Sequence, residues 1–102
     1  MYHLLTSDVF DSEEAFRVGL VQEVVPFGSE LERATEIAEI ICEGAPLAVQ
    51  ATKRSSMRYV TEGEQAAIAA MGADQTLLAE TEDAEEGVNA FKERRKGNFK
   101  GK

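Results

Sequence analysis

Residues 81–102 read TEDAEEGVNAFKERRKGNFKGK and combine one complete helix with a basic ending. Thr81 is a good capping residue, and the acids that follow it fall in the first turn, where the helix dipole favours negative charge. Ala84, Val88 and Phe91 recur at i, i+4 and i+7, which predicts a single apolar helix face. The stretch therefore predicts a short amphipathic helix followed by a positively charged segment.

The basic ending is unusual because the chain as a whole is acidic. The 102 residues carry a formal net charge of −8, yet six of the eleven Lys and Arg residues lie at or after position 92, where Glu93 is the only acid. The helix dipole explains basic residues at 94–96 without any ligand. The dipole does not explain why Phe91 and Phe99 flank these basic residues. Aromatic rings beside basic side chains suit a ligand that carries both a ring and phosphates. On spacing alone, both interpretations stay open.

The remaining sequence predicts a mainly α fold of about five short helices with one short extended segment. Capping residues and breaks at glycine and proline place the other helices at about residues 12–18, 29–43, 46–60 and 64–80. LVQEVV, at residues 20–25, is β-branched and roughly alternating, so it is the one credible strand or extended segment. MYHLL at the N-terminus resembles the tail of a helix whose start is missing, and we expect Met1 to be an internal residue of a longer protein.

Length and composition limit the classes of protein that fit. A chain of 102 residues supports one small domain over residues 1–102, and a domain of this size buries little surface, so we expect an oligomer or a neighbouring domain to complete it. An acidic body disfavours nucleic-acid binding, which needs a broad basic surface. No apolar run reaches transmembrane length, and the N-terminus does not resemble a signal peptide. We therefore expect a cytoplasmic protein with neither a nucleic acid nor a membrane as partner.

Few residues suggest chemistry. His3 is the only histidine, and a lone histidine beside leucines is more often packed than catalytic. Cys42 is the only cysteine, which leaves no internal disulfide or thiolate metal site, and its isoleucine neighbours favour a buried, inert thiol. Adjacent acids such as Glu85 and Glu86 are expected on solvated helix faces rather than in a pocket. The residues alone predict no catalytic site and no metal site.

Four motifs, in this order, resemble the C-terminal part of the enoyl-CoA hydratase/isomerase family, also called the crotonase superfamily. The motifs are LLT (4–6), AFRVGLVQEVVP (15–26), APLAVQATK (45–53) and EGVNAFKERRKGNFKG (86–101). Each is weak alone, but four in the correct order across essentially the whole chain are specific. Ser7 stands where the family commonly has glycine and Gly97 where it commonly has proline, and both departures fall in expected loops.

The resemblance implies a helical C-terminal region that lacks the family's N-terminal core of repeated ββα turns. In the family, that core carries the catalytic glutamates and two backbone N–H groups that stabilise a thioester enolate. No catalytic residue can therefore be carried over to this chain. The implied substrate is an acyl-CoA thioester, with no covalently bound cofactor and no metal, and the implied assembly is a trimer or a dimer of trimers.

Hydration of a 2-enoyl-CoA is the leading reaction for the complete protein, because the ending of the chain is similar to that of the family's hydratases. Isomerases, hydrolases and decarboxylases share the fold, and their distinguishing residues lie elsewhere. A non-catalytic helical oligomerisation module is the alternative from another class, and weak binding of an anionic surface by the basic segment is a third.

The resemblance also implies two binding residues. In the family's hydratases, the aromatic residue of the ending and the basic residue three positions later reach the adenosine and the 3′-phosphate of CoA, from a neighbouring subunit. These positions are Phe91 and Arg94 here. Arginine replaces the common lysine, which keeps the charge and adds a planar fork that suits phosphate.

Overall fold

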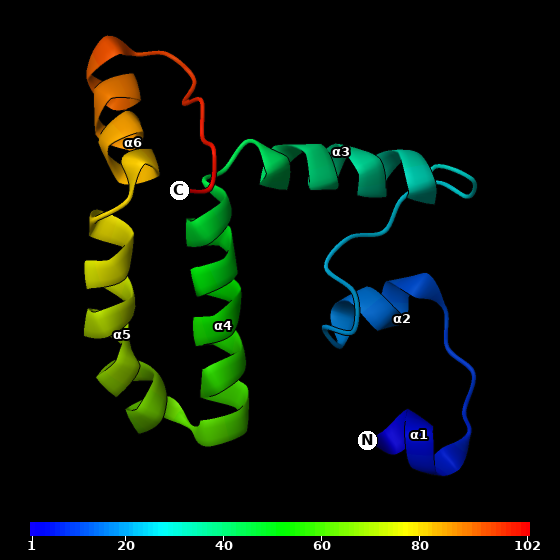
Figure 1. The fold of residues 1–102 in the computed structure, drawn as a ribbon. Helices are drawn as coiled ribbons and strands as arrows, with labels where there is room; N and C mark the ends of the chain where they lie inside the picture. The colour runs from blue at the N-terminus through cyan, green and yellow to red at the C-terminus, as the bar shows by residue number, and fades with distance from the viewer. The chain divides into compact units, whose positions relative to one another are not determined.

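The computed structural model describes residues 1–102, which form six helices and no strand (Figure 1). The helices are α1 (Tyr2–Thr6), α2 (Ser12–Arg17), α3 (Glu30–Cys42), α4 (Pro46–Glu62), α5 (Glu64–Ala79) and α6 (Glu82–Glu93). The predicted mainly α class is confirmed, and the predicted helices recur within a few residues of their expected bounds. None of the helices is both long and apolar enough to cross a bilayer.

Capping chemistry sets the helix starts as the sequence predicts. An oxygen of the Asp11 side chain accepts a hydrogen bond from the Glu14 N–H at 2.9 Å, which caps α2. The Thr81 hydroxyl accepts one from the Ala84 N–H at 3.1 Å, which caps α6. Pro46 opens α4, where its missing N–H removes no helical hydrogen bond.

The segment at residues 20–25 does not form a strand. The N–H groups of Leu20 and Val21 donate to the Ala15 carbonyl at 2.9 and 3.4 Å, so they close the end of α2 instead of joining a ladder. A strand needs a second strand to satisfy its backbone groups, and this chain forms none. Of the two alternatives that the β-branched pattern left open, the structure therefore excludes the strand and has a non-helical segment between α2 and α3.

The chain divides into two compact units, residues 1–35 and 36–102. In the first unit, the His3 ring packs against the rings of Tyr2 and Phe10, with centroids 5.3 and 4.2 Å apart. His3 Nε2 also lies 3.9 Å from a carboxylate oxygen of Glu14. His3 is thus packed among neighbours, as expected for a lone histidine without a catalytic partner.

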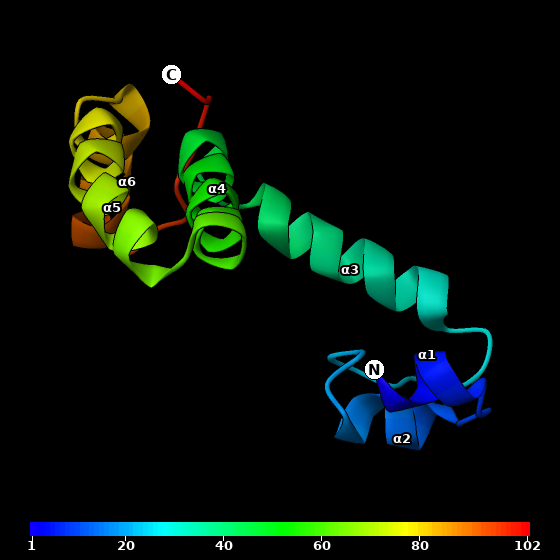
Figure 2. The same ribbon diagram turned by 90° about the horizontal axis from the view of Figure 1, so that it is seen from below.

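The second unit is built on an antiparallel hairpin of α4 and α5, which lie side by side in both views (Figures 1 and 2). Ala51 of α4 and Ala67 of α5 are 5% and 7% exposed, because small side chains let the two helices approach closely. Arg58 and Asp74 connect the helices through an Nη1–Oδ2 ion pair of 3.2 Å. α6 follows α5 and meets it near their junction.

The core of this chain is small, and its large apolar side chains are mostly exposed. Only four apolar residues are buried, and all four are alanines: Ala15, Ala51, Ala67 and Ala90. Ile68 on α5, for example, is 60% exposed. Cys42 is also exposed, so the expectation of a buried thiol is wrong: α3 buries none of its residues, and the neighbours Ile40 and Ile41 are exposed with it.

Candidate functional site

α6 buries a different face from the one that its apolar spacing predicts. Val88 and Phe91, on the predicted face, are 53% and 86% exposed, whereas Asp83 and Ala90 are buried. Gly87 lies between these two on the helix surface, and a Cβ there would meet the Phe99 ring at 3.8 Å. The buried face is therefore covered by the C-terminal segment and leaves Phe91 in solvent.

Arg94 ends α6 in a left-handed conformation, with φ 55° and ψ 40°. The Arg94 N–H donates to the Phe91 carbonyl at 3.2 Å and the Arg95 N–H to the Ala90 carbonyl at 3.0 Å, the hydrogen-bond pattern of a Schellman motif. Glycine usually occupies this position, since an L-residue is strained there by roughly 1 kcal/mol. Arg94, with its long charged side chain, thus adopts the left-handed turn at a cost in backbone strain.

The basic ending divides into paired and unpaired cations. Arg95, Lys96 and Lys102 each form an ion pair with an acid, whereas the side chains of Lys92 and Arg94 have no hydrogen-bond or ion-pair partner. Three of the six basic residues of this ending therefore form ion pairs with acids of the same chain. The unpaired guanidinium of Arg94 lies three residues from the exposed Phe91 ring, at the same end of α6.

After Arg94 the chain turns back along α6 and ends beside the start of α4 (Figure 1). The buried Asp83 carboxylate accepts hydrogen bonds from the N–H groups of Lys100 and Gly101, both at 2.7 Å. The Asp83 N–H donates in turn to the Lys102 carbonyl at 3.1 Å. One side chain in the first turn of α6 thus holds the final residues of the chain.

Glu86, one turn further along α6, holds the beginning of the same segment. Its carboxylate pairs with the Arg95 guanidinium through bonds of 2.5 and 3.0 Å and accepts the Asn98 N–H at 2.8 Å. These donors, Arg95 above all, lower the pKa of Glu86 to about 2. The Glu86 carboxylate, and after it that of Glu93, in turn raise the pKa of Arg95. Glu86 is therefore not the solvated surface acid that the sequence predicts, whereas its neighbour Glu85 is exposed.

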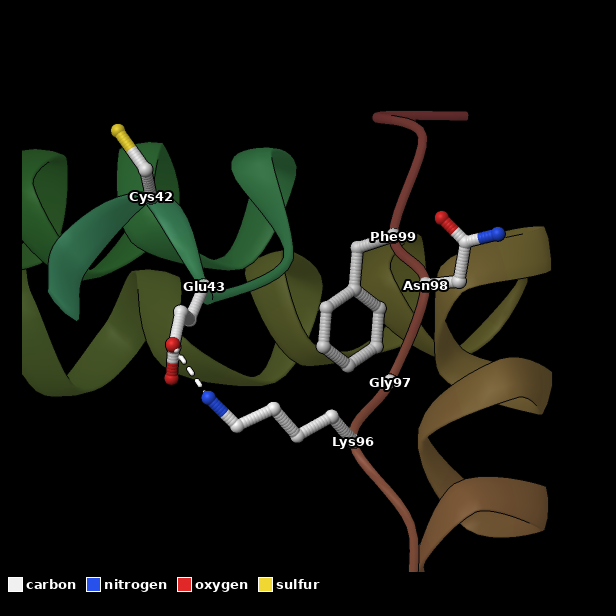
Figure 3. Close-up of a pocket in the computed structure, with 6 residues that line it drawn as sticks. All are labelled: Cys42, Glu43, Lys96, Gly97, Asn98 and Phe99. Atoms are coloured by element: carbon white, nitrogen blue, oxygen red, sulfur yellow. Dashed lines mark hydrogen bonds and ion pairs between the residues drawn. The ribbon is translucent and has the colours of Figure 1, made fainter. Parts of the chain in front are cut away.

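Phe99 packs within the second unit rather than beside Phe91. Figure 3 shows its ring between the C-terminal segment and the end of α3, while the Lys96 side chain reaches the Glu43 carboxylate, with Nζ and Oε1 2.5 Å apart. These residues line a hollow of about 250 Å³ together with Gly97, and the Cys42 thiol points away from them. The two phenylalanines that flank the basic run therefore differ: Phe99 is half-buried, and Phe91 is free.

The two predicted binding residues thus lie at one exposed end of α6, and both are available to a ligand or to another chain. Sequence reasoning missed Asp83 and Glu86, whose carboxylates accept hydrogen bonds from backbone N–H groups that no side-chain pattern reveals. Glu86 stands in the EG motif of the ending, but a motif alone does not tell which partner its carboxylate meets. No group of three or more His, Cys, Asp or Glu side chains is placed to hold a metal ion.

Comparison with known proteins places this geometry in a family. Residues 1–102 match the family model described as enoyl-CoA hydratase/isomerase. The chain is 39% identical over 101 residues to (E)-benzylidenesuccinyl-CoA hydratase of Thauera aromatica, covering 99% of the chain and 40% of the relative. It is 35% identical over 99 residues to 2,3-dehydroadipyl-CoA hydratase of Escherichia coli K12, covering 97% of the chain and 39% of the relative.

Solved structures agree. The chain superposes on a crystal structure of a probable enoyl-CoA hydratase/isomerase from Mycobacterium abscessus with a TM-score of 0.92 and 44% identity, covering 96% of the chain and 38% of that structure. It therefore spans about 40% of the length of the curated relatives that it matches. The helical fold, the order of the motifs and the match over all 102 residues show that the chain belongs to the enoyl-CoA hydratase/isomerase family.

Proposed function

We propose that this chain is the CoA-binding and subunit-packing helical region of an enzyme that hydrates a 2-enoyl-CoA thioester. In this proposal, the Phe91 ring packs on the adenine of CoA and the Arg94 guanidinium pairs with the 3′-phosphate. Both contacts are made toward the active site of a neighbouring subunit in a trimer or a dimer of trimers. The catalytic carboxylates and the oxyanion hole lie in a part of the protein outside these residues.

The observation that carries the proposal is that the Phe91 ring is exposed and that the Arg94 guanidinium has no ion-pair partner. Phe91 is 86% exposed at the end of α6, although burying a phenylalanine is favourable. Arg94 has no acid partner, although Arg95 and Lys96 beside it are both paired. An exposed ring beside an unpaired guanidinium suits a nucleotide that offers an aromatic base and a phosphate.

The names of the relatives support the substrate class. The two curated relatives described above are hydratases of CoA thioesters, which makes hydration the first reaction to test. No residue of this chain is assigned a catalytic role, so the 102-residue chain alone should not hydrate crotonyl-CoA. The cheapest first measurement is the sequence upstream of Met1, where a core with two glutamates and oxyanion-hole glycines would support an enzyme.

The decisive test is Arg94→Ala in the complete protein, with binding of CoA and of 3′-dephospho-CoA measured by calorimetry. We expect CoA affinity to fall by roughly 1–3 kcal/mol, the scale of a charge-assisted hydrogen bond, and the loss to shrink for the dephospho form and at high salt. Phe91→Ala should weaken both ligands alike, because the ring contacts the base by packing.

Arg54→Ala is the matched control, since it removes an unpaired arginine from the exposed surface of α4 and should leave both affinities unchanged. Equal losses for the two CoA forms in Arg94→Ala would reject the phosphate contact. No loss in either form would leave Arg94 as an ordinary helix end that the dipole favours.

A further inference from the structure

We propose that Asp83 and Glu86 are positioning residues that act together as a C-terminal latch, in which these two carboxylates hold residues 95–102 against α6 and thereby keep Arg94 turned out for its ligand. The inference rests on the proposed function of Arg94. It adds two residues that do not contact the ligand and that act through the backbone conformation of Arg94.

The need for such a latch comes from the Arg94 backbone. A left-handed φ of 55° is natural for glycine and strained for arginine. Left to itself, this position would favour a right-handed conformation that continues the helix or frays it. The left-handed turn persists only when the surrounding structure determines it, and such strain is concentrated at functional sites.

The latch supplies that constraint from both ends of the segment. Glu86 draws the Arg95 side chain back along α6 and accepts the Asn98 N–H. Asp83 accepts the next two N–H groups, from Lys100 and Gly101. The donors near the beginning of the segment, Arg95 and Asn98, bind Glu86, and those near its end, Lys100 and Gly101, bind Asp83, which lies closer to the start of α6. The segment therefore runs antiparallel to α6.

The two carboxylates differ from ordinary surface acids in what they bind. Asp83 is 4% exposed and is the only buried charged residue, and both of its oxygens accept from backbone N–H groups. Charge-assisted bonds to backbone donors are among the strong hydrogen bonds in proteins. Glu85, between the two on the sequence, is exposed and has no such partner, which makes it a matched control on the same helix.

If the two carboxylates act as one unit, removing one of them should also weaken the hydrogen bonds made to the other, which amide exchange measures. In the 102-residue chain, Glu86→Gln should reduce the amide protection of Gly101 at least tenfold, although Gly101 donates to Asp83. Asp83→Asn should likewise reduce the protection of Asn98, which donates to Glu86. Glu85→Gln should change neither amide. Effects confined to the mutated residue's own donors would overturn the latch and leave two independent hydrogen-bonding sites.

The positioning role is tested in the complete protein by a double-mutant cycle on the ratio of Kd values for 3′-dephospho-CoA and CoA. Glu86→Gln should lower this ratio at least threefold, Glu85→Gln should not, and Glu86→Gln should add nothing when Arg94 is already alanine. Additive effects, or an unchanged ratio in Glu86→Gln, would overturn the positioning role. If Arg94→Ala itself leaves the ratio unchanged, the proposed phosphate contact fails, and the amide protection then decides the latch alone.

Discussion

At the scale of single residues, the chain places arginine where a helix ending of this kind normally has glycine. Arg94 adopts the left-handed conformation of a Schellman motif, and nothing in its side-chain contacts compensates for the strain. A residue that is unfavourable for stability and free of internal partners is the pattern expected where function outweighs stability. Substitutions of Arg94 can separate its effect on stability from its proposed role in ligand binding.

We expect Arg94→Gly to raise the free energy of unfolding of the 102-residue chain by up to about 1 kcal/mol, because glycine adopts φ 55° without strain. The gain is limited because glycine also increases the entropy of the unfolded chain. Arg94→Ala keeps a Cβ and should show no such gain. Urea denaturation of the three proteins measures the difference, and a glycine variant less stable than the alanine variant would contradict the strain.

Glu86 gives the latch a defined response to acid. Its pKa is lowered from the ordinary 4.5 to about 2 by Arg95, the Asn98 N–H and the nearby Lys100 charge, and Glu93 shares the Arg95 guanidinium. A lowered pKa means that the carboxylate's contribution to stability is complete above pH 4.5. This contribution is lost as the pH falls from 4.5 toward 2.

The amide proton of Asn98 should report this titration directly, because its hydrogen bond weakens when Glu86 takes up a proton. We expect its NMR chemical shift to move upfield with a midpoint near pH 2, and the movement to disappear in Glu86→Gln. A midpoint near 4.5 in the wild-type chain would show that Arg95 and Asn98 do not hold the carboxylate in solution.

At the scale of the helices, local sequence signals predict the starts and stops well and the buried faces poorly. Thr81, Asp11 and Pro46 act as expected because capping depends on a few neighbouring residues. The buried face of α6 is displaced from the predicted one because it packs against residues 95–102, and that contact depends on the Asp83 and Glu86 hydrogen bonds. Periodicity cannot predict a face that is covered by an irregular segment, because the position of that segment depends on hydrogen bonds to polar side chains.

The Thr81 cap allows a clean test at this scale. Thr81→Ala removes the acceptor for the Ala84 N–H and the hydroxyl that donates to the Leu78 carbonyl at 2.7 Å, so it should lower the free energy of unfolding by roughly 1 kcal/mol. Thr52→Ala on α4 is the control, because that hydroxyl only donates to the Ala48 carbonyl within the helix. Equal losses in urea denaturation would argue against a specific cap on α6.

At the scale of the whole molecule, the chain exposes more apolar surface than its four buried alanines can offset. The resemblance in the sequence predicted the family and the mainly α fold, and the family match and superpositions confirm both. The ligand contacts of Phe91 and Arg94 stay predictions, because the sequence shows the aromatic and basic residues but not the ligand that they would bind. Large apolar side chains on α3, α4 and α5 are exposed in this chain, for example Ile40, Val60 and Ile68.

We expect the 102-residue chain to self-associate, because burying these side chains against another copy is favourable and the chain covers them poorly by itself. Sedimentation velocity across a range of concentrations should show species larger than 11.2 kDa. Ile68→Glu places a charge on an exposed apolar site of α5 and should shift the distribution toward monomer, whereas Lys53→Glu on α4 should have less effect. A well-folded monomer at every concentration would contradict the expectation.

The meeting of Gly101 with Pro46 also bears on how this part of the chain folds. A Cβ on Gly101 would lie 3.5 Å from the Pro46 ring, so the end of the chain closes onto the start of α4 across almost all of residues 46–102. α4 and α5 are joined by Gly63 alone, and such local contacts form early because little loop entropy opposes them. We therefore expect the closure at Gly101 to come later in refolding, so that residues 95–102 become ordered last and open first in local unfolding.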